Sequence, residues 1–383
     1  MHFSLSYIYA MHKLSSRLFF AGLLFLSMIS SGQQKSKPVV IGYVGGYRGL
    51  VHTDSIEAEK LTHINYAFVD MKDSLAWLHR EASDTINFRN LGALKTKNPD
   101  LKILISIGGW TWSKTFSDAI LNDTMRQNFA YSASTIVRDF DLDGVDIDWE
   151  YPGLRGDNNS FRPEDKQNYT LMFRAIRASL DSLQLLTKKK YLVTTAVGGF
   201  YDFIAHTEMD KAQQYLDFVN IMSYDFKTEA DTLSGHHTNL YSYTNAENEQ
   251  SGDRCVREFI AAGVPPSKIV LGLAFYGRGF KVDPGDNRGL NEKILVTQRG
   301  GGFTRLKDSL INQQGYKRYW DKKAKAPYLY NKETKVFITY DDEKSIRLKC
   351  RYVRKNKLGG VMFWEYFNDP KGYLLGIVDK NLR

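Results

Sequence analysis

Eight short runs rich in β-branched and aromatic residues recur along this chain, and segments with helical patterns separate them. Several runs are almost continuously apolar, which is typical of parallel strands that are buried on both faces. The runs begin at Val39, His63, Lys102, Asp143, Leu192, Phe218, Ile269 and Leu358. The clearest helical patterns cover 122–140 and 164–184. Strands that alternate with helices belong to the α/β class, and eight of them predict a (β/α)8 TIM barrel.

One interval between strands is too long for a single helix and its loops. It separates Tyr276, taken as the end of the seventh strand, from Trp364, taken as the end of the eighth. Within it, residues 281–337 carry a glycine-rich turn, a helical run and two aromatic runs that resemble strands. We therefore expect a small α+β insertion at 281–337 between strands seven and eight, within a single barrel domain that covers 33–383.

The first 32 residues have a different composition from the rest of the chain. Lys13 and Arg17 precede the apolar stretch 18–29, small residues follow it, and the segment contains no acidic residue. This layout predicts a secretory signal peptide at 1–32. The stretch is shorter than the roughly 20 residues that cross a bilayer, so an uncleaved anchor is the weaker alternative. We expect a secreted or periplasmic mature protein with no membrane span.

Charge and cysteine content exclude several classes of protein. The formal net charge is +9, but the basic residues are scattered among acids, which indicates a basic surface and no nucleic-acid partner. Cys255 and Cys350 are the only cysteines, so a disulfide framework is excluded, while pairing of these two stays open. His236 and His237 have no third ligand at suitable spacing. We expect a monomer without a metal or an organic cofactor.

The fourth run, 143-DGVDIDWEYP, carries the strongest indication of chemistry. Because strand side chains alternate between faces, Asp146, Asp148 and Glu150 share one face, and three apolar residues share the other. Carboxylates this close repel one another, so some of them hold protons at neutral pH. A calcium loop of the EF-hand type is excluded because the glycine and glutamate that it needs are missing. Asp143 breaks the two-residue spacing, so we expect it to be structural.

The active site of such a barrel lies at the C-terminal ends of its strands, where Glu150 is expected. The other strand ends supply mostly aromatic side chains, together with an acid and an arginine. The expected ring consists of Tyr43, Phe68, Trp110, Met222, Tyr224, Asp225, Tyr276, Arg278 and Trp364. Ala196 ends the fifth strand and helps to shape the pocket. Because aromatic faces stack against pyranose rings, a carboxyl group within such walls predicts cleavage of glycosidic bonds.

The acidic run resembles the D-x-x-D-x-D-x-E signature of family 18 glycoside hydrolases, the chitinases. Four other runs resemble further motifs of that family: 106-SIGGW, 222-MSYDF, 274-AFYGRGF and 360-GVMFWEY. The resemblance covers the chain from about Val39 onward, with the motifs in the family's order. One short acidic run is moderate evidence, whereas five ordered motifs are specific.

The resemblance implies retaining hydrolysis of β-1,4-linked N-acetylglucosamine polymers or oligomers, in which the substrate's acetamido group is the nucleophile and an oxazolinium ion forms. Glu150 would protonate the leaving oxygen and later activate water. Asp148 would orient the acetamido group, and Asp146 would share a proton with Asp148. Tyr224 would donate a hydrogen bond to the same acetamido group. These four residues are the expected catalytic residues.

The resemblance also implies a set of substrate contacts. Trp364 would form the floor under the distorted sugar, and Trp110 would stack a sugar on the leaving-group side, with Trp112 a weaker candidate. Arg278 would contact substrate hydroxyls or else pair only with a nearby acid. The full expected set is Tyr43, Phe68, Gly109, Trp110, Tyr151, Met222, Asp225, Tyr276, Arg278 and Trp364.

Three other functions stay open at this point. The first is a non-catalytic chitin-binding lectin of the same fold, although such relatives usually lack the catalytic glutamate. The second is an endo-β-N-acetylglucosaminidase that acts on N-linked glycans, and the third is hydrolysis of bacterial cell-wall glycans. The long interval before strand eight and the tryptophan after 106-SIGG favour chitin-type substrates. The sequence leaves exo and endo action undecided.

Overall fold

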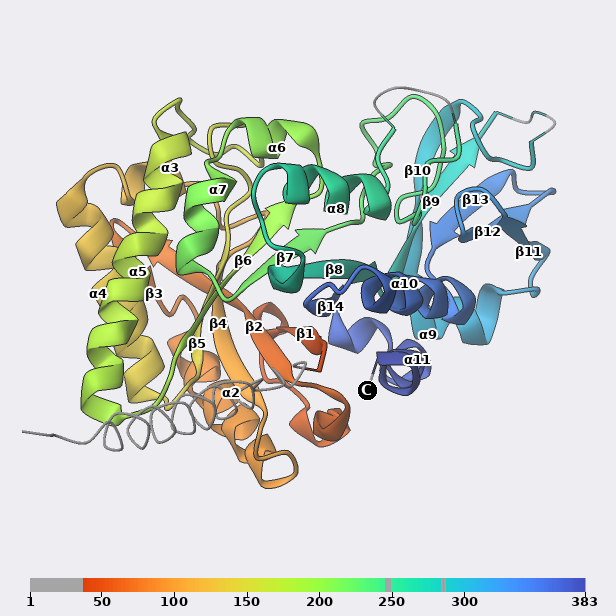
Figure 1. The fold of residues 1–383 in the computed structure, drawn as a ribbon. Coiled ribbons are helices and arrows are strands. Elements are labelled where there is room, and N and C mark those ends of the chain that lie inside the picture. The colour runs from red at the N-terminus through yellow and green to blue at the C-terminus, as the bar shows by residue number, and fades with distance from the viewer. Residues whose placement is uncertain (1–36, 245–248, 284, 286, 383) are drawn as a thin grey trace, which may run out of the picture. The chain divides into compact units, whose positions relative to one another are not determined.

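Eight parallel strands form a closed barrel in the computed structural model, which describes residues 37–244, 249–283, 285 and 287–382 (Figure 1). The strands are β1 (Val39–Gly45), β2 (His63–Lys72), β4 (Lys102–Gly108), β5 (Gly144–Asp148), β6 (Leu192–Gly198), β7 (Phe218–Met222), β8 (Ile269–Ala274) and β14 (Gly360–Trp364). Their order is β1-β14-β8-β7-β6-β5-β4-β2, and pairing of β1 with β2 closes the ring. The predicted (β/α)8 barrel is confirmed. The signal peptide expected at 1–32 lies outside the described residues.

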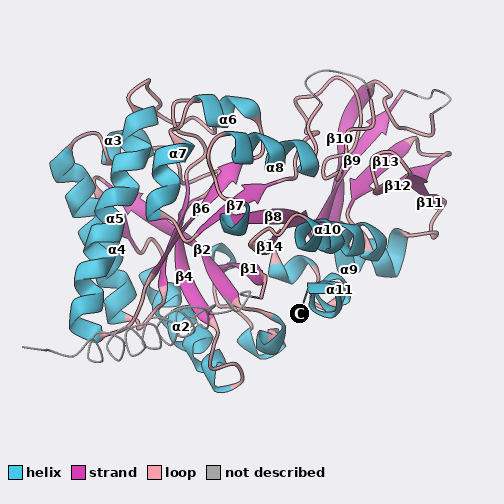
Figure 2. Ribbon diagram, viewed as in Figure 1, coloured by secondary structure: helices cyan, strands magenta, loops and turns pink. Residues whose placement is uncertain are grey.

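Helices surround the strands on the outside of the barrel (Figure 2). They are α2 (Glu81–Ala93), α3 (Phe116–Ala119), α4 (Asp123–Asp139), α5 (Asp165–Thr187), α6 (Tyr201–Ala205), α7 (Met209–Ala212), α8 (Gly252–Ala261), α10 (Glu343–Lys355) and α11 (Tyr373–Leu382). The helical patterns at 122–140 and 164–184 correspond to α4 and α5. The Asn122 side chain accepts a hydrogen bond from the backbone N–H of Met125 and so caps α4.

The connection between β1 and β2 departs from the alternation of strands and helices. It consists of three 3-10 turns, η1 (Gly46–Arg48), η2 (Thr53–Ser55) and η3 (Ala58–Lys60). The segment is short and carries glycines at its start, and it has no long run of apolar residues at helical spacing. A further short strand, β3 (Leu75–Trp77), pairs antiparallel with the end of β2.

Alternation along the strands divides the apolar side chains between two cores. On β1, Ile41 and Tyr43 face the barrel interior, where they pack with Ala196 and Met362. Val40 and Val44 face the layer between the strands and the helices. Both cores are buried from water, and burial of each such side chain stabilises the fold by about 1.5–3 kcal/mol. Asp146 of the acidic run lies in the same interior, where it accepts a hydrogen bond from Tyr43.

A five-stranded antiparallel sheet follows β8 and stands beside α10 in Figure 1. Its strands are β9 (Tyr276–Val282), β10 (Ile294–Gly302), β11 (Tyr316–Asp321), β12 (Ala326–Asn331) and β13 (Val336–Tyr340), with α9 (Phe303–Arg305) and the π-turn η7 (Leu306–Leu310) after β10. The seventh predicted run therefore supplies two strands, one to the barrel and one to this sheet. Phe275 separates the two strands, and its backbone N–H donates to Trp364 O at 2.9 Å. The sheet begins five residues before the expected insertion, at Tyr276.

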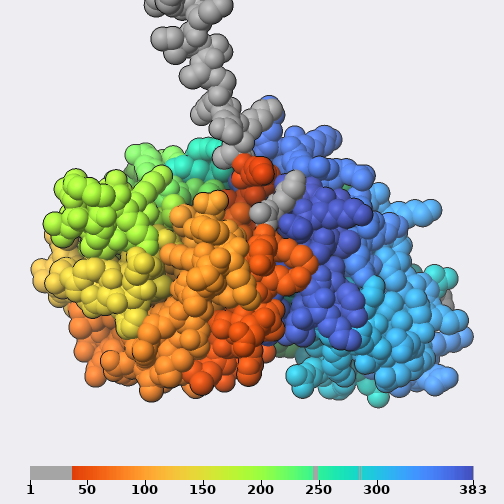
Figure 3. Space-filling view, turned by 90° about the horizontal axis from the view of Figure 1, so that it is seen from below, coloured from red at the N-terminus to blue at the C-terminus, as the bar shows by residue number. Residues whose placement is uncertain are grey.

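The first and last barrel strands pair with each other, and on the surface in Figure 3 red atoms from the N-terminal part of the barrel lie beside blue atoms from its C-terminal part. Val39 pairs with Gly360 across this seam. A Cβ at Gly360 would lie 2.1 Å from Val39 O, so a side chain there would force the strands apart. Cys255 in α8 and Cys350 in α10 are both buried free thiols. In the described part of the chain, no helix is long and apolar enough to cross a membrane.

Candidate active site

The acidic run lies on β5 and the turn after it, and its side chains alternate between the two cores. Val145, Ile147 and Trp149 pack into the layer between strands and helices. The Trp149 ring stacks on Phe116 at a centroid distance of 5.1 Å. Asp146 points the other way, into the barrel interior, where its partners come from other strands. The predicted division of faces is therefore present in the structure.

Asp146 accepts hydrogen bonds from four side chains on four other barrel strands. Its Oδ2 accepts from Tyr43 Oη at 2.9 Å and from Ser106 Oγ at 2.7 Å. Its Oδ1 accepts from Thr194 Oγ1 at 2.5 Å and from Asn220 Nδ2 at 3.2 Å. Burial raises the pKa of Asp146, and the four donors oppose this rise because they favour the carboxylate. The side chain is thus fixed at the centre of the barrel.

Asp148 is buried and incompletely satisfied. It is 4% exposed, and its Oδ1 has no hydrogen-bond partner among the described residues. Burial raises the pKa of Asp148 well above its usual value, and the charges of Glu150 and Asp146 raise it further. A buried acceptor without a donor is costly for the fold. The open oxygen is therefore available to a donor on a ligand.

Glu150 directly follows β5 and is held there by a serine. Ser113 Oγ accepts from the Glu150 backbone N–H at 2.9 Å and donates to Asp148 O at 3.1 Å. Burial raises the pKa of Glu150 to about 7, with a hydrogen bond from Tyr151 opposing the rise and the charge of Asp225 adding to it. A carboxyl group with a pKa near neutrality can both donate and take back a proton.

Aromatic rings from β1, β2 and η1 gather around Trp364, the last residue of β14. Phe68 stacks on it with ring centroids 5.6 Å apart, and Tyr47 lies parallel to it at 6.3 Å. Tyr43 is tilted against the same ring at 5.9 Å. Gly109 has a φ of +82°, and a Cβ there would lie 2.6 Å from the Phe68 ring. The glycine pair of 106-SIGGW thus makes room for an aromatic side chain.

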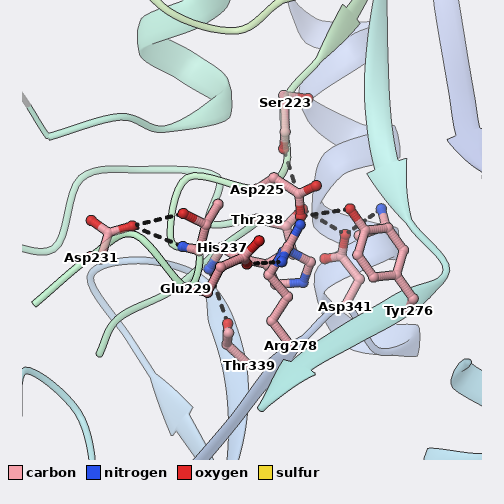
Figure 4. A network of polar contacts seen from close by, with 12 residues as sticks. Ser223, Asp225, Glu229, Asp231, His237, Thr238, Tyr276, Arg278, Thr339 and Asp341 are labelled. Carbon is pink, nitrogen blue, oxygen red and sulfur yellow. Dashed lines mark hydrogen bonds and ion pairs between the residues drawn. The ribbon is translucent and has the colours of Figure 1, made fainter. Parts of the chain in front are cut away.

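A second polar group lies at the start of the antiparallel sheet (Figure 4). Asp225 Oδ1 accepts from Tyr276 Oη at 2.7 Å and from Arg278 Nε at 2.6 Å, and His237 Nδ1 lies 3.4 Å away. Burial opposes ionisation of Asp225, but Arg278 and His237 outweigh it and lower its pKa. Arg278 also pairs with Glu229 at 3.0 Å. Arg278 therefore pairs with acids in this structure.

The remaining inner residues line the space between these groups. Met222, Ala196 and Tyr224 belong to the inner core. Tyr224 Oη donates to Met362 Sδ at 3.7 Å, a weak contact for a hydroxyl group. The ring of Tyr224 lies 6.1 Å from that of Tyr276. Tyr224 therefore connects the aromatic rings around Trp364 with the group around Asp225.

The other predicted residues lie at the margins. Trp110 is 51% exposed and its ring lies 6.3 Å from that of Tyr151. Trp112 contacts His79, away from the central rings. Asp143 lies at the start of β5, where it accepts from the backbone N–H of Ile103 at 2.8 Å and pairs with Lys95 at 2.7 Å and Lys189 at 3.1 Å. A structural role for Asp143 stays a prediction.

The two histidines of the loop after β7 have separate partners. His236 Nε2 lies 3.2 Å from Asp321, whereas His237 Nδ1 faces Asp225. They therefore do not converge on one point. Across the residues that the structure describes, no group of three or more histidine, cysteine, aspartate or glutamate side chains could hold a metal ion.

Several residues of the site were not predicted. They are Ser106, Ser113, Thr194, Asn220, Tyr47 and His237. The two-residue period could have found Thr194 and Asn220, because they precede Ala196 and Met222 on the same strand faces. Ser113 and His237 lie on loops and Tyr47 lies in the short 3-10 turn η1, where no strand period applies.

Comparison with known proteins agrees with this arrangement. Chitinase A1 of Niallia circulans is 36% identical over 86% of this chain, and the match covers 56% of that protein. Chitotriosidase-1 of Mus musculus is 32% identical over 81% of this chain and 67% of its own length. The structure of a family 18 N-acetylglucosaminidase from Paenibacillus barengoltzii superimposes with a TM-score of 0.83 at 42% identity, covering 90% of this chain and all of that one. Residues 39–369 match the sequence profile of the glycosyl hydrolases family 18, and this chain belongs to that family.

Proposed function

We propose that this chain hydrolyses β-1,4-linked N-acetylglucosamine oligomers or polymers, with retention of configuration. The observation that carries the proposal is the pairing of Glu150, whose pKa is about 7, with a buried Asp148 whose Oδ1 has no partner among the described residues. The carboxyl group of Glu150 can supply a proton, and Asp148 Oδ1 can accept a hydrogen bond from a substrate. Relatives named as chitinases support the substrate class. The match covers 56% of chitinase A1, so the proposal for this chain rests on the residues of its own site.

In the proposed reaction, Glu150 gives its proton to the glycosidic oxygen as the bond to the anomeric carbon breaks. The carbonyl oxygen of the substrate's own acetamido group forms the new bond to that carbon, which gives an oxazolinium ion. The unpartnered Oδ1 of Asp148 accepts the acetamido N–H, and the Tyr224 hydroxyl donates to the same group. A water molecule then attacks the anomeric carbon and gives a proton back to Glu150, while the bond from that carbon to the acetamido oxygen breaks and the acetamido group is restored.

The neighbouring residues support this chemistry through position and charge. Asp146 is held by four donors that favour its carboxylate, and the negative charge of that carboxylate raises the pKa of Asp148. The Trp364 ring and the parallel rings of Phe68 and Tyr47 offer flat apolar faces to the sugar rings. Asp225 faces the same space, where its charge raises the pKa of Glu150.

The test is hydrolysis of N-acetylglucosamine oligomers of defined length, with the products identified by mass spectrometry. The Glu150→Gln variant is expected to lose activity by about 10²- to 10⁴-fold, because it keeps the shape of the side chain but has no acidic proton to transfer. Glu258→Gln on α8, where Glu258 pairs with Arg254, is the matched control and keeps full activity. Cleavage by the Glu150→Gln variant at the wild-type rate contradicts the proposal. Binding without cleavage by the wild type indicates a lectin.

Release of single N-acetylglucosamine units is a second candidate within this function. It is favoured by the Paenibacillus protein, which is named an N-acetylglucosaminidase and is covered over its whole length at 42% identity. Monosaccharide as the sole early product from hexamers supports this exo action. Early dimers, trimers and tetramers support endo action. The same mass spectra therefore decide between the two.

We further propose that the chain is exported and that residues 1–32 are removed, which leaves 33–383 as the catalytic barrel with the antiparallel sheet inserted after β8. The basic residues and the apolar stretch of this segment support the proposal, and the family match begins only at residue 39. The mass of the N-terminal peptide of the protein recovered outside the cytoplasm tests it. Protein that retains residues 1–32 in that fraction contradicts the cleavage.

A further inference from the structure

Two backbone hydrogen bonds hold His237 between the antiparallel sheet and the chain that follows β7. Its backbone N–H donates to Thr339 Oγ1 on β13 at 3.1 Å, and its carbonyl accepts from the backbone N–H of Phe226 at 3.1 Å. The loop that carries His237 is thus tied both to the antiparallel sheet and to the chain that leaves β7. These bonds fix the backbone from which the imidazole ring projects.

The imidazole ring of His237 is completely buried and uses only one of its two nitrogens. Nδ1 lies 3.4 Å from Asp225 Oδ1, and Nε2 is buried without a hydrogen-bond partner among the described residues. Because a carboxylate can only accept, the tautomer that carries the proton on Nδ1 fits this contact. The ring of Tyr276 lies against the imidazole at 5.2 Å.

Groups of both signs face His237 from the elements around it. They are Asp225 after β7, Tyr276 and Arg278 on β9, and Asp341 after β13. Burial lowers the pKa of His237, and Arg278 lowers it further, although Asp225 and Asp341 oppose this. Burial of the ring thus favours the neutral imidazole, whose Nδ1–H can still donate to Asp225. We therefore look for its contribution in the orientation of Asp225.

Asp225 needs such orientation because its backbone and side chain are both unusual. Its φ is +60°, a left-handed conformation that side chains seldom adopt. Its Oδ1 accepts from Tyr276 and Arg278, and both of these side chains are partly exposed. His237 is the buried member of the three, out of reach of a substrate, and Figure 4 shows it beside Asp225. Whatever His237 does for the reaction, it does through Asp225.

We propose that His237 is a positioning residue, whose Nδ1–H holds the Asp225 carboxylate in the orientation that both contacts the substrate and faces Glu150. This inference rests on the proposed function. When the donor is removed, Asp225 keeps Arg278 and Tyr276 but gains freedom to rotate away from Glu150. Two consequences are expected: weaker substrate binding, and a basic limb of the pH–rate profile that moves to lower pH, because the charge of Asp225 helps to raise the pKa of Glu150.

Two isosteric variants separate this role from simple filling of space. Asn at position 237 places an amide N–H where Nδ1 lies now, whereas Gln places it near the unpartnered Nε2. His237→Asn is expected to keep KM and the basic limb of the wild type. His237→Gln and His237→Leu are expected to raise KM by roughly 3- to 10-fold, the effect of one lost hydrogen bond, and to shift the basic limb downward. Equal behaviour of the Asn and Gln variants overturns the proposal.

A double-mutant cycle with Asp225→Asn supplies a second readout that a merely structural role would not give. If His237 acts through Asp225, His237→Gln adds no further loss in an Asp225→Asn background. Losses that add in full overturn the proposal. Thermal unfolding of each variant identifies any that does not fold, and the Asn–Gln comparison remains if the Leu variant fails. Failure of the wild type to cleave oligomers would instead overturn the proposed function.

Discussion

The Tyr43 hydroxyl on the first barrel strand donates to Asp146 Oδ2 on β5 at 2.9 Å, across the barrel interior. A bond between residues 103 positions apart exists only after the barrel has closed. It places a tyrosine of the aromatic group and the central acid of the site in one rigid unit. Several properties of the protein follow from this and the neighbouring contacts.

Tyr43→Phe removes one of the four donors to Asp146, and we expect the free energy of unfolding to fall by about 1–3 kcal/mol. Activity per folded molecule falls as well, because Asp146 gains freedom beside Asp148. Urea denaturation and oligomer hydrolysis measure the two effects. Tyr66→Phe is the matched control, since Tyr66 Oη donates to buried Asp84 at 2.6 Å in the outer layer. It loses similar stability and keeps activity, and equal loss of activity in both variants contradicts the prediction.

The pH dependence of kcat/KM reports the state of Glu150. Glu150 must be protonated to act as an acid, so activity falls as the pH rises through about 7. Burial is the main cause of that raised pKa, and the charge of Asp225 adds to it. Asp225→Asn removes this charge and leaves Arg278 with Glu229 as its acidic partner, so the basic limb moves to lower pH. A limb that stays in place, in rates measured from pH 4 to 9, argues against this coupling.

Asp148→Asn is expected to stabilise the protein at neutral pH while it abolishes most activity. The pKa of Asp148 is raised on folding, so its ionisation opposes the folded state. Stability is lost as the pH rises from the unfolded pKa of about 4 through the folded pKa. Asn cannot ionise, so the variant loses less stability over that range. Urea midpoints at pH 4 and pH 8 test this, and an unchanged difference between the two pH values contradicts it.

Asp143→Asn is expected to change the pH dependence of stability in the opposite direction. Burial opposes ionisation of Asp143, but Lys95 and the backbone N–H of Ile103 outweigh it and lower the pKa. Its carboxylate therefore stabilises the fold above the unfolded pKa of about 4, and that contribution is lost as the pH falls. The variant is expected to lose about 1–3 kcal/mol at pH 7, less at pH 4, and no activity per folded molecule. A selective loss of kcat would place Asp143 in the site.

The two cysteines are expected to resist thiol reagents in the folded protein. Both are buried, and burial raises the pKa of Cys350 to about 12 and that of Cys255 as well. A colorimetric thiol assay should therefore detect little reaction in native buffer and two thiols after denaturation in urea. Rapid reaction of one thiol in the native state would show that its helix opens locally. A count below two after denaturation would indicate oxidation.

Much of the site could be predicted because it depends on local periods. The two-residue alternation of β5 placed Asp146 and Asp148 inward and Trp149 outward, and the structure has the same division. The same period extends to Thr194 and Asn220, which lie on the inner faces of β6 and β7. Because side chains alternate along a strand, the face on which one residue lies fixes the faces of its neighbours, and the sequence pattern is enough to predict them.

The loops and the antiparallel sheet follow no such rule. The residues of the seventh run do not indicate that the chain passes from the barrel to the second sheet at Phe275, because strands of the two sheets have similar compositions. Likewise, the group of His237 and Arg278 around Asp225 joins a loop, a strand of the second sheet and the end of β7. Such contacts depend on how separate elements pack, which short-range patterns do not encode.

The sequence by itself determined the barrel, the order of its strands and the inward face of the acidic run. Hydrophobic periodicity and the family's five motifs involve residues that are close in sequence, so both can be recognised without the tertiary structure. Only the tertiary structure decided which acids are satisfied and which are not. Asp146 receives four donors and Asp148 Oδ1 receives none among the described residues, although both sit on the same strand face. That difference, and the raised pKa of Glu150, arise from burial and from partners brought together by closure of the barrel.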